Sequence, residues 1–426
     1  MTREIRPITP EYIEDYLTIY LNAYPAYKNT GEEGRNKYRP RFLRSMAEDS
    51  HIHFYGLFED NRLIAQMKLI DFDMNAFGQM KKATGLMALG VHPMYKKKGA
   101  ARDMVKFFEN YTEESGAIVS MLLPFRMDFY RNMGYGYGSK MDEYVLPAKQ
   151  LPAADPSEME KITFINSDDH ATDMILDCYR KFAEGYHGMC QKFENELEDY
   201  YGDSETHRVG YFDGKELKGY VTYDIHCMSE TNYTLNRIEV KELVYLTPQA
   251  LRGLLGFLHN QSDLAETIII RTGEPDFHHL LPSAQNISGH YTDFGFLETN
   301  TSSIGTMYKI TDPANFVLET SYRKFIPFEL KVKFEYYDEL EHSHDAFGVQ
   351  FTTEGKWDLY GNVTDDSAFD VIVNCNLADL SSLFMGSADF AALARLGVVK
   401  VNKEGYTHLL DLLFHVDQKP WTNTDY

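Results

Sequence analysis

The chain has 426 residues and a formal net charge of −22, because 64 aspartates and glutamates outnumber 42 lysines and arginines. An apolar fraction of 43% is enough for packed cores, so we expect a globular protein with about two to four domains. The acidic balance argues against nucleic acid and anionic membranes as partners and favours basic small molecules or peptides.

No apolar run is long enough to span a bilayer, and the N-terminus has no pattern of a signal peptide. The four cysteines show no zinc-binding spacing, and their number is typical of a reducing cytoplasm, where we expect the protein to reside. They are Cys178, Cys190, Cys227 and Cys375. His92 and the His278–His279 pair have no ligand partner at metal spacing in the sequence, so we predict no metal site.

The first elements alternate between strand and helix patterns. Residues 5–11 read as a first strand and a helix start, with Thr9 as the N-cap and Pro10 at the first helical position. Residues 32–47 are polar and partly helical, and residues 53–70 have the pattern of a β-hairpin with a turn at 59–62.

The most informative stretch covers residues 85–108. Its first part, 86–91, is an apolar run of strand length that Pro93 ends, and a helical pattern begins at Ala101. The loop between them, residues 96–101, is short and rich in lysine and small residues. Such a loop directs backbone N–H groups toward an anion, and the helix dipole adds positive potential. Taken alone, the pattern also fits an ordinary turn between a strand and a helix.

Two motifs resemble those of the GNAT superfamily of N-acetyltransferases. Val91-His-Pro93 followed by Gly99 and Ala101 resembles its acetyl-coenzyme A signature, although Lys96 stands where arginine or glutamine is usual. After a further predicted strand at 117–123, residues 129–137 resemble the aromatic and glycine segment that often follows in this family.

The resemblance implies that acetyl-coenzyme A is the cosubstrate. The edge of the strand would hold the thioester, and the loop would hold the pyrophosphate. These cofactor-binding residues are Leu89, Gly90 and Val91, then Lys96, Lys97, Lys98, Gly99, Ala100 and Ala101. Tyr130 lies where the family places a general acid for the departing thiolate. The alternative for Tyr130 is a packed aromatic side chain beside Phe129.

The middle of the chain repeats the order of the first part more faintly, which suggests a duplicated domain. The stretch after Pro248 has neither a lysine cluster nor a Gly-x-Ala pattern, so we predict that the second copy binds no coenzyme. The three similarities pair 57–63 with 211–217, 91–93 with 246–248, and 130–135 with 291–296.

From about residue 305 the pattern changes to amphipathic strands at 328–336, 347–353, 356–364 and 368–374. Helices ending at glycine follow at 376–386 and 390–397. This order resembles the sterol carrier protein fold, and the whole chain resembles the enhanced intracellular survival protein family of bacterial acetyltransferases. We therefore predict an α/β (α+β) fold with two GNAT-like mixed-sheet domains, 1–150 and 151–304, and a sterol-carrier-like domain, 305–426.

The resemblance also implies a function. Acetyl transfer to an amine of a cationic substrate is expected, by direct attack in a ternary complex, and the family suggests a homo-oligomer, a hexamer. The family places the chain's terminal carboxylate in the active site, here that of Tyr426, and Asp425 would add negative charge beside the substrate. A frayed terminus is the alternative. The alternative function is a non-catalytic protein that binds acyl-coenzyme A or lipid through the C-terminal domain.

Overall fold

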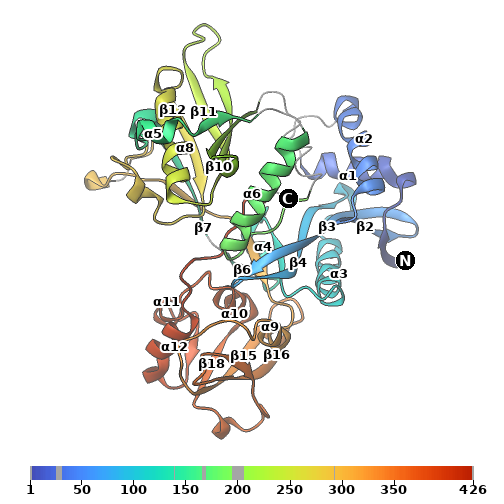
Figure 1. Ribbon diagram of the computed structural model, residues 1–426. Helices are drawn as coiled ribbons and strands as arrows, with labels where there is room; N and C mark the ends of the chain where they lie inside the picture. The colour runs from blue at the N-terminus through green and yellow to red at the C-terminus, as the bar shows by residue number, and fades with distance from the viewer. Residues whose placement is uncertain are drawn as a thin grey trace. The chain divides into compact units, whose positions relative to one another are not determined.

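The computed structural model describes residues 2–24, 31–138, 140–165, 169–193, 206–291 and 293–424. The chain forms two compact units (Figure 1). One unit combines Met1–Gly138 with Thr306–Pro420, and the other combines Ser139–Gly305 with Trp421–Thr424. Among the described residues, none of the helices has the length and apolar character needed to cross a bilayer.

The first unit contains a seven-stranded sheet in the order β1-β2-β3-β4-β5-β14-β6. Neighbouring strands are antiparallel except β4 and β5, which are parallel. The strands are β1 (Arg3–Pro7), β2 (Ile52–Glu59), β3 (Arg62–Ala76), β4 (Gln79–Val91), β5 (Ser120–Leu122), β14 (Met307–Lys309) and β6 (Gly136–Tyr137).

Helices cover both faces of this sheet because its side chains alternate in direction. On β2, Phe54 packs on Tyr16 and Phe42, whereas the next residue, Tyr55, packs on Phe107. The helices α1 (Ile13–Ala23) and α2 (Glu32–Glu48) therefore cover one face, and α3 (Ala100–Glu114) covers the other (Figure 1).

The second unit is built around a sheet in the order β13-β7-β12-β11-β10-β9-β8, with α8 packed against its core. Only β11 and β12 are parallel neighbours, as β4 and β5 are in the first sheet. The strands are β7 (Lys140–Pro147), β8 (Ile162–Phe164), β9 (His207–Asp213), β10 (Glu216–Cys227), β11 (Asn236–Tyr245), β12 (Thr267–Thr272) and β13 (Thr301–Ile304); the helices are α5 (Pro156–Met159), α6 (Asp169–Gly185) and α8 (Pro248–Asn260).

Two strands pair in a different sheet from the strand that precedes them in sequence, an arrangement that we call strand exchange. β7 follows β6 directly in the sequence, yet it pairs between β12 and β13 of the second sheet. β14 follows β13 directly, yet it pairs between β5 and β6 of the first sheet. The predicted boundary at residue 150 lies after β7, whereas the second unit begins at Ser139.

The first unit also contains a five-stranded sheet in the order β17-β16-β15-β18-β19, which packs on a mostly aromatic core. Phe384 on α10 stacks on Phe414 of α12 at 5.6 Å between ring centres, and Trp357 packs beside both rings. The elements are α9 (Pro313–Glu319), β15 (Leu330–Asp338), β16 (Ser343–Phe351), β17 (Trp357–Leu359), β18 (Val371–Asn376), α10 (Leu377–Phe384), α11 (Phe390–Arg395), β19 (Lys400–Val401) and α12 (Thr407–Phe414).

The predicted fold class is confirmed, since both GNAT-like sheets and the sterol-carrier-like sheet are present. Two details differ. The strand predicted at 356–364 shortens to β17, Trp357–Leu359. The segment at 291–296, compared with 130–135 in sequence, does not share its conformation: Phe294 is 99% exposed with φ of 62°, whereas Tyr130 and Tyr135 are buried.

Candidate active site

A β-bulge interrupts β4 close to its end. The register of β3 and β4 pairs Gln66 with Gly90 but Lys68 with Met87, so β4 carries one extra residue here. Within the bulge Ala88 has φ of 54°, a left-handed conformation that costs energy for a residue other than glycine. Bulges redirect a strand and end its regular pairing, which makes this backbone available for other contacts.

The strands β4 and β5 separate beyond the bulge. They pair only over Thr84–Leu86 and Ser120–Leu122, and β4 continues to Val91 without a partner strand on that side among the described residues. The predicted residues Leu89, Gly90 and Val91 lie on this free edge. The Leu89 carbonyl accepts a hydrogen bond from the Tyr24 hydroxyl at 3.1 Å. Tyr24 is the C-cap residue of α1.

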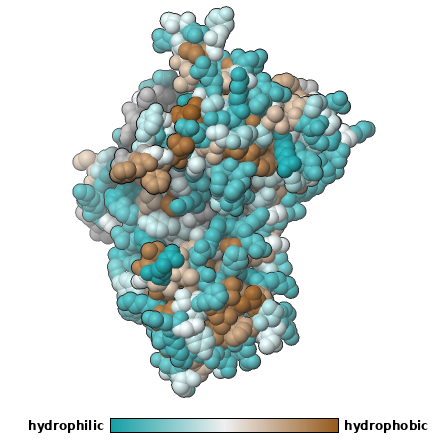
Figure 2. Space-filling model, turned by 90° about the vertical axis from the view of Figure 1, so that its left-hand side faces the viewer, coloured by the Kyte–Doolittle hydropathy of each residue, from teal (hydrophilic) through white to brown (hydrophobic). Residues whose placement is uncertain are grey.

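Large apolar side chains are exposed next to this edge. Leu123, Phe125 and Met127 follow the end of β5, and Phe125 is 76% exposed. The Phe125 ring lies edge-on to Tyr24 at 6.4 Å. The surface is otherwise largely hydrophilic on the face that Figure 2 shows, with separate hydrophobic patches. Exposed apolar side chains at a sheet edge are suited to contact a ligand with apolar parts.

The lysine loop leads into α3 with an open backbone. The short helix Pro93–Tyr95 follows β4, and the side chains of Lys96, Lys97 and Lys98 are exposed. Gly99 is the N-cap of α3, with φ of 86° and no side-chain cap, and a Cβ placed on it would meet nothing within 4 Å. The first N–H groups of a helix have no partner within the helix. Those of Ala100 and Ala101 therefore face the open position at Gly99.

Arg3 fixes the loop to the sheet. Its guanidinium donates to the Lys98 carbonyl at 3.2 Å and to the Asp103 carboxylate at 2.8 Å, and it also pairs with Glu59 at 3.0 Å. These bonds join β1, the loop and the first turn of α3. Arg3 thus restrains the backbone that the sequence predicts for pyrophosphate binding.

Tyr130 lies on the short helix α4 (Met127–Arg131), which follows β5. Its side chain is 7% exposed and packs between Phe129 and Tyr135. Burial raises the pKa of Tyr130 to about 12. The hydroxyl is therefore protonated at neutral pH, and it makes no hydrogen bond with another described residue.

Parallel neighbouring strands end at the same edge of a sheet. The lysine loop follows β4 and Tyr130 follows β5, so the fold brings both predicted groups to one edge. His92 caps the short helix after β4, where its Nδ1 accepts from the Met94 N–H at 3.3 Å. Asp425 and Tyr426, the other two predicted site residues, lie outside the described residues.

The tail that leads to those two residues packs into the second unit. Trp421 is largely buried beside Phe182 and Tyr186, and its backbone N–H donates to the His187 carbonyl at 3.2 Å. Its ring fills the space above Gly273, where a Cβ would approach the ring to 2.5 Å. The tail is therefore anchored up to Thr424 rather than extended into solvent.

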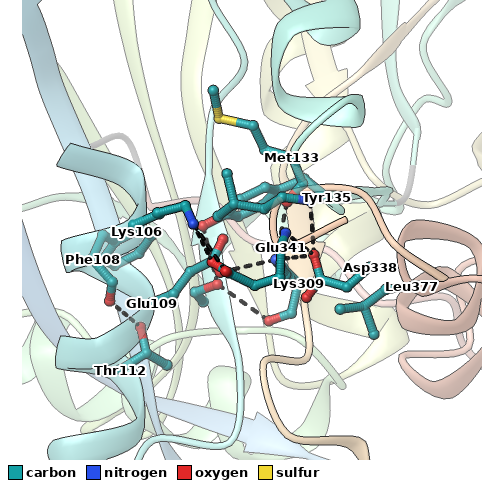
Figure 3. Close-up of polar contacts among 12 residues, drawn as sticks. Lys106, Phe108, Glu109, Thr112, Met133, Tyr135, Lys309, Asp338, Glu341 and Leu377 are labelled. Carbon is teal, nitrogen blue, oxygen red and sulfur yellow. Dashed lines mark hydrogen bonds and ion pairs between the residues drawn. The ribbon is translucent and has the colours of Figure 1, made fainter. Parts of the chain in front are cut away.

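Several polar residues around Tyr130 were not predicted from the sequence. Lys309 on β14 is fully buried, and its Nζ lies 2.9 Å from Glu109, 3.6 Å from Asp338 and 3.1 Å from the Met133 carbonyl (Figure 3). Arg131 pairs with Asp379 on α10. These partners are far apart in sequence, and the only local signal was a lysine within the apolar run Met307–Ile310.

In the second GNAT-like domain a side chain caps the N-terminus of α8, whereas α3 in the first domain has no side-chain cap. The N-cap of α8 is Thr247, in extended conformation, and its hydroxyl accepts from the Ala250 N–H at 3.1 Å. Pro248 follows at the first helical position and has no N–H to offer. The side chain of Thr247 thus occupies the place that an anion would need.

One histidine pair has a closer ligand partner than the sequence indicated. Asp276, His278 and His279 place a carboxylate oxygen and two imidazole nitrogens within 4.8 Å of one another. All three come from one short segment around the helix Phe277–Leu280, and two of them are exposed. Side chains of residues this close in sequence come together without a metal, so this cluster does not by itself indicate a metal site.

Comparisons with known protein families identify three domains along the chain. Residues 4–138 and 188–294 match two families described as acetyltransferase (GNAT) domains, and residues 316–423 match a sterol carrier protein domain. No curated protein matches the sequence.

Solved structures share the fold over the whole length. A probable N-acyltransferase from Enterococcus faecalis has a TM-score of 0.78 at 17% identity, and a GCN5-related N-acetyltransferase from Anabaena variabilis has 0.78 at 15%. Eis1 from Mycobacterium abscessus has 0.76 at 18%. Each comparison covers 100% of both chains. The chain is thus an acyltransferase of the GNAT superfamily, with two GNAT domains and a sterol carrier protein domain, and it shares the fold of the enhanced intracellular survival proteins.

Proposed function

We propose that the first domain transfers an acetyl group from acetyl-coenzyme A to an amine of a cationic substrate, without a metal. The observation that carries this proposal is the open N-terminus of α3 beside the free edge of β4. Backbone N–H groups and three lysines there suit a pyrophosphate, and the bulged edge suits a thioester.

The reaction needs few protein groups. The amine attacks the thioester carbonyl, an oxyanion forms near the Gly90–Val91 backbone, and the C–S bond breaks with the electron pair leaving on sulfur. Tyr130 donates its proton to that thiolate. A pKa of about 12 keeps this donor protonated at neutral pH. The terminal carboxylate of Tyr426 orients the amine and accepts its proton through water, and Asp425 attracts the cation.

The alternative, a non-catalytic protein that binds lipid, lacks a supporting contact in the described residues. The third sheet packs on an aromatic core in which Trp357, Phe384 and Phe414 are almost fully buried against one another.

An acetylation screen tests the proposal. The purified chain is incubated with acetyl-coenzyme A and, in turn, with aminoglycosides, polyamines and basic peptides, and released thiol is measured. We expect amine-dependent thiol release with at least one class. No release above hydrolysis, together with stabilisation by acyl lipids rather than by acetyl-coenzyme A, would support the lipid-binding alternative instead.

A further inference from the structure

We propose that residues beyond position 306 position Tyr130, with Asp379 of the sterol-carrier-like domain and Lys309 of β14 in the first sheet as the main positioning residues. This inference rests on the proposed function of Tyr130 as the proton donor. It assigns to the third domain a part in the reaction of the first.

The residues that follow Tyr130 are held by residues from beyond position 300. Arg131, the next residue along the chain, forms an ion pair with Asp379 on α10, and Asp379 is 5% exposed. The Arg131 guanidinium also lies over the Tyr137 ring at 5.0 Å. Because α4 is a single short helix, fixing Arg131 fixes the backbone of its neighbour Tyr130.

Lys309 holds the next turn. Its Nζ donates to the Met133 carbonyl at 3.1 Å, and its Cε would lie 3.0 Å from a Cβ on Gly134. Glu109 and Asp338 hold Lys309 in turn, so the bond to Met133 comes from an ammonium group fixed on two sides (Figure 3). Tyr135, which packs on Tyr130, accepts a bond from Ser120 at 3.2 Å.

Residues of α10 and of the turn after it hold the end of the segment that follows Tyr130. The Tyr137 carbonyl accepts bonds from the hydroxyls of Ser382 at 2.9 Å and Ser387 at 2.8 Å. Gly136 lies so close to this helix that a Cβ would approach the Ala378 carbonyl to 2.2 Å. Only glycine permits this approach, and it leaves β6 little freedom to move relative to α10.

These contacts converge on one segment, the residues that follow Tyr130. The Tyr130 hydroxyl itself has no hydrogen bond among described residues. Its direction is therefore set by the backbone of α4 and by ring packing. A misplacement of about 1 Å at a reacting group can lower a rate on the order of a hundredfold.

The test compares Asp379→Asn with Asp389→Asn. The first removes the charge that pairs with Arg131, and the second removes an exposed ion pair with Lys419 in the same domain. We expect Asp379→Asn to lower kcat about tenfold to a hundredfold, with KM for acetyl-coenzyme A within about twofold of wild type. Asp389→Asn should leave both unchanged, and Asp379→Glu should restore part of kcat.

A double variant separates positioning from stability. If Asp379 acts through Tyr130, then Tyr130→Phe with Asp379→Asn should turn over no more slowly than Tyr130→Phe alone. An additive loss would overturn the proposal, as would wild-type kcat in Asp379→Asn. Should Asp379→Asn fail to fold, Ser382→Ala removes one bond to Tyr137 and serves as the second variant.

Hydrogen exchange distinguishes this inference from the proposed function. Amides of residues 133–137 should exchange faster in Asp379→Asn than in wild type or Asp389→Asn, whatever the activity. Unchanged exchange refutes the positioning role. Wild-type turnover in Tyr130→Phe refutes instead the acid role of Tyr130, and the positioning role falls with it.

Discussion

Tyr130 is buried between Phe129 and Tyr135, and its hydroxyl has no hydrogen-bond partner among the described residues. We expect Tyr130→Phe to lower kcat on the order of a hundredfold, because the thiolate then leaves without a proton donor. Acetyl-coenzyme A affinity should stay near wild type, which calorimetry can check. With a pKa of about 12, Tyr130 stays protonated well above neutral pH, so its titration should cause no loss of kcat between pH 7 and pH 9. Equal turnover in the variant would return Tyr130 to a packing role.

Gly99 is the residue on which coenzyme binding depends most directly. We expect Gly99→Glu to abolish acetyl-coenzyme A binding, because the side chain would enter the open position and repel the pyrophosphate. Gly116→Glu is a matched control at the other end of α3, with φ of 73° and equally open surroundings. It should bind one coenzyme per chain, as we also expect of wild type. Two coenzymes per wild-type chain in calorimetry would show that the second copy also binds.

At the scale of elements, Glu109 of α3 forms a buried ion pair with Lys309 of β14, and its carboxyl group titrates in an accessible pH range. Burial raises the pKa of Glu109 from its usual value to about 7, although Lys309 opposes this, and Asp338 and Glu341 add repulsion. The folded state then binds a proton more tightly than the unfolded state. The stabilisation is complete below the unfolded pKa and is lost as pH rises through about 7.

We therefore expect the Tm of wild type to fall between pH 5 and pH 8 by more than the Tm of Glu109→Gln does. Glutamine keeps the shape of the side chain and cannot titrate. Glu339, whose pKa burial also raises to about 7, contributes equally to both proteins, so the difference reports Glu109. Parallel pH curves for the two proteins would contradict the assignment.

The sequence predicted those elements whose signals are local. The strand, loop and helix at 86–108 follow from an apolar run, Pro93 and Gly99, and their structure agrees with the prediction. The bulge at Ala88 has no such signal, since alanine does not favour positive φ. The position of β14 between β5 and β6 was also not predictable, because a strand of three residues carries little sequence signal for its pairing partners. The roles of Arg131, Lys309 and Asp379 depend on that pairing.

At the scale of the whole molecule, the exchange of strands makes the two GNAT sheets unequal. All strands of the second sheet lie within residues 139–305, whereas the first sheet needs β14 from residues 307–309. We expect a fragment of residues 139–305 to fold on its own, and a fragment of residues 1–150 to stay unfolded or aggregate. Circular dichroism and size-exclusion chromatography of both fragments can check this. A folded, monomeric 1–150 fragment would show that β14 is dispensable.

The C-terminal tail gives a second prediction at this scale. A chain without Asp425 and Tyr426 should lose most turnover but keep its fold and its binding of acetyl-coenzyme A, because the terminal carboxylate is displaced. Gly273→Ala should act in the same direction without removing any residue, since its Cβ would meet the Trp421 ring at 2.5 Å. Activity and thermal shift measured on both variants test the role, and full turnover in the shortened chain contradicts it.

The strand exchange also has a consequence for synthesis on the ribosome. The first sheet cannot close when its own residues emerge, because β14 is made only after the entire second GNAT domain. During that interval β5 and β6 lack the strand that separates them in the finished sheet, and unpaired edges are prone to aggregate. The second domain has all its strands by residue 305 and lacks only the segment Trp421–Thr424, so it can fold first. The acyltransferase domain at the N-terminus would then be finished late, with the third domain, so a truncated nascent chain would not carry a completed active site.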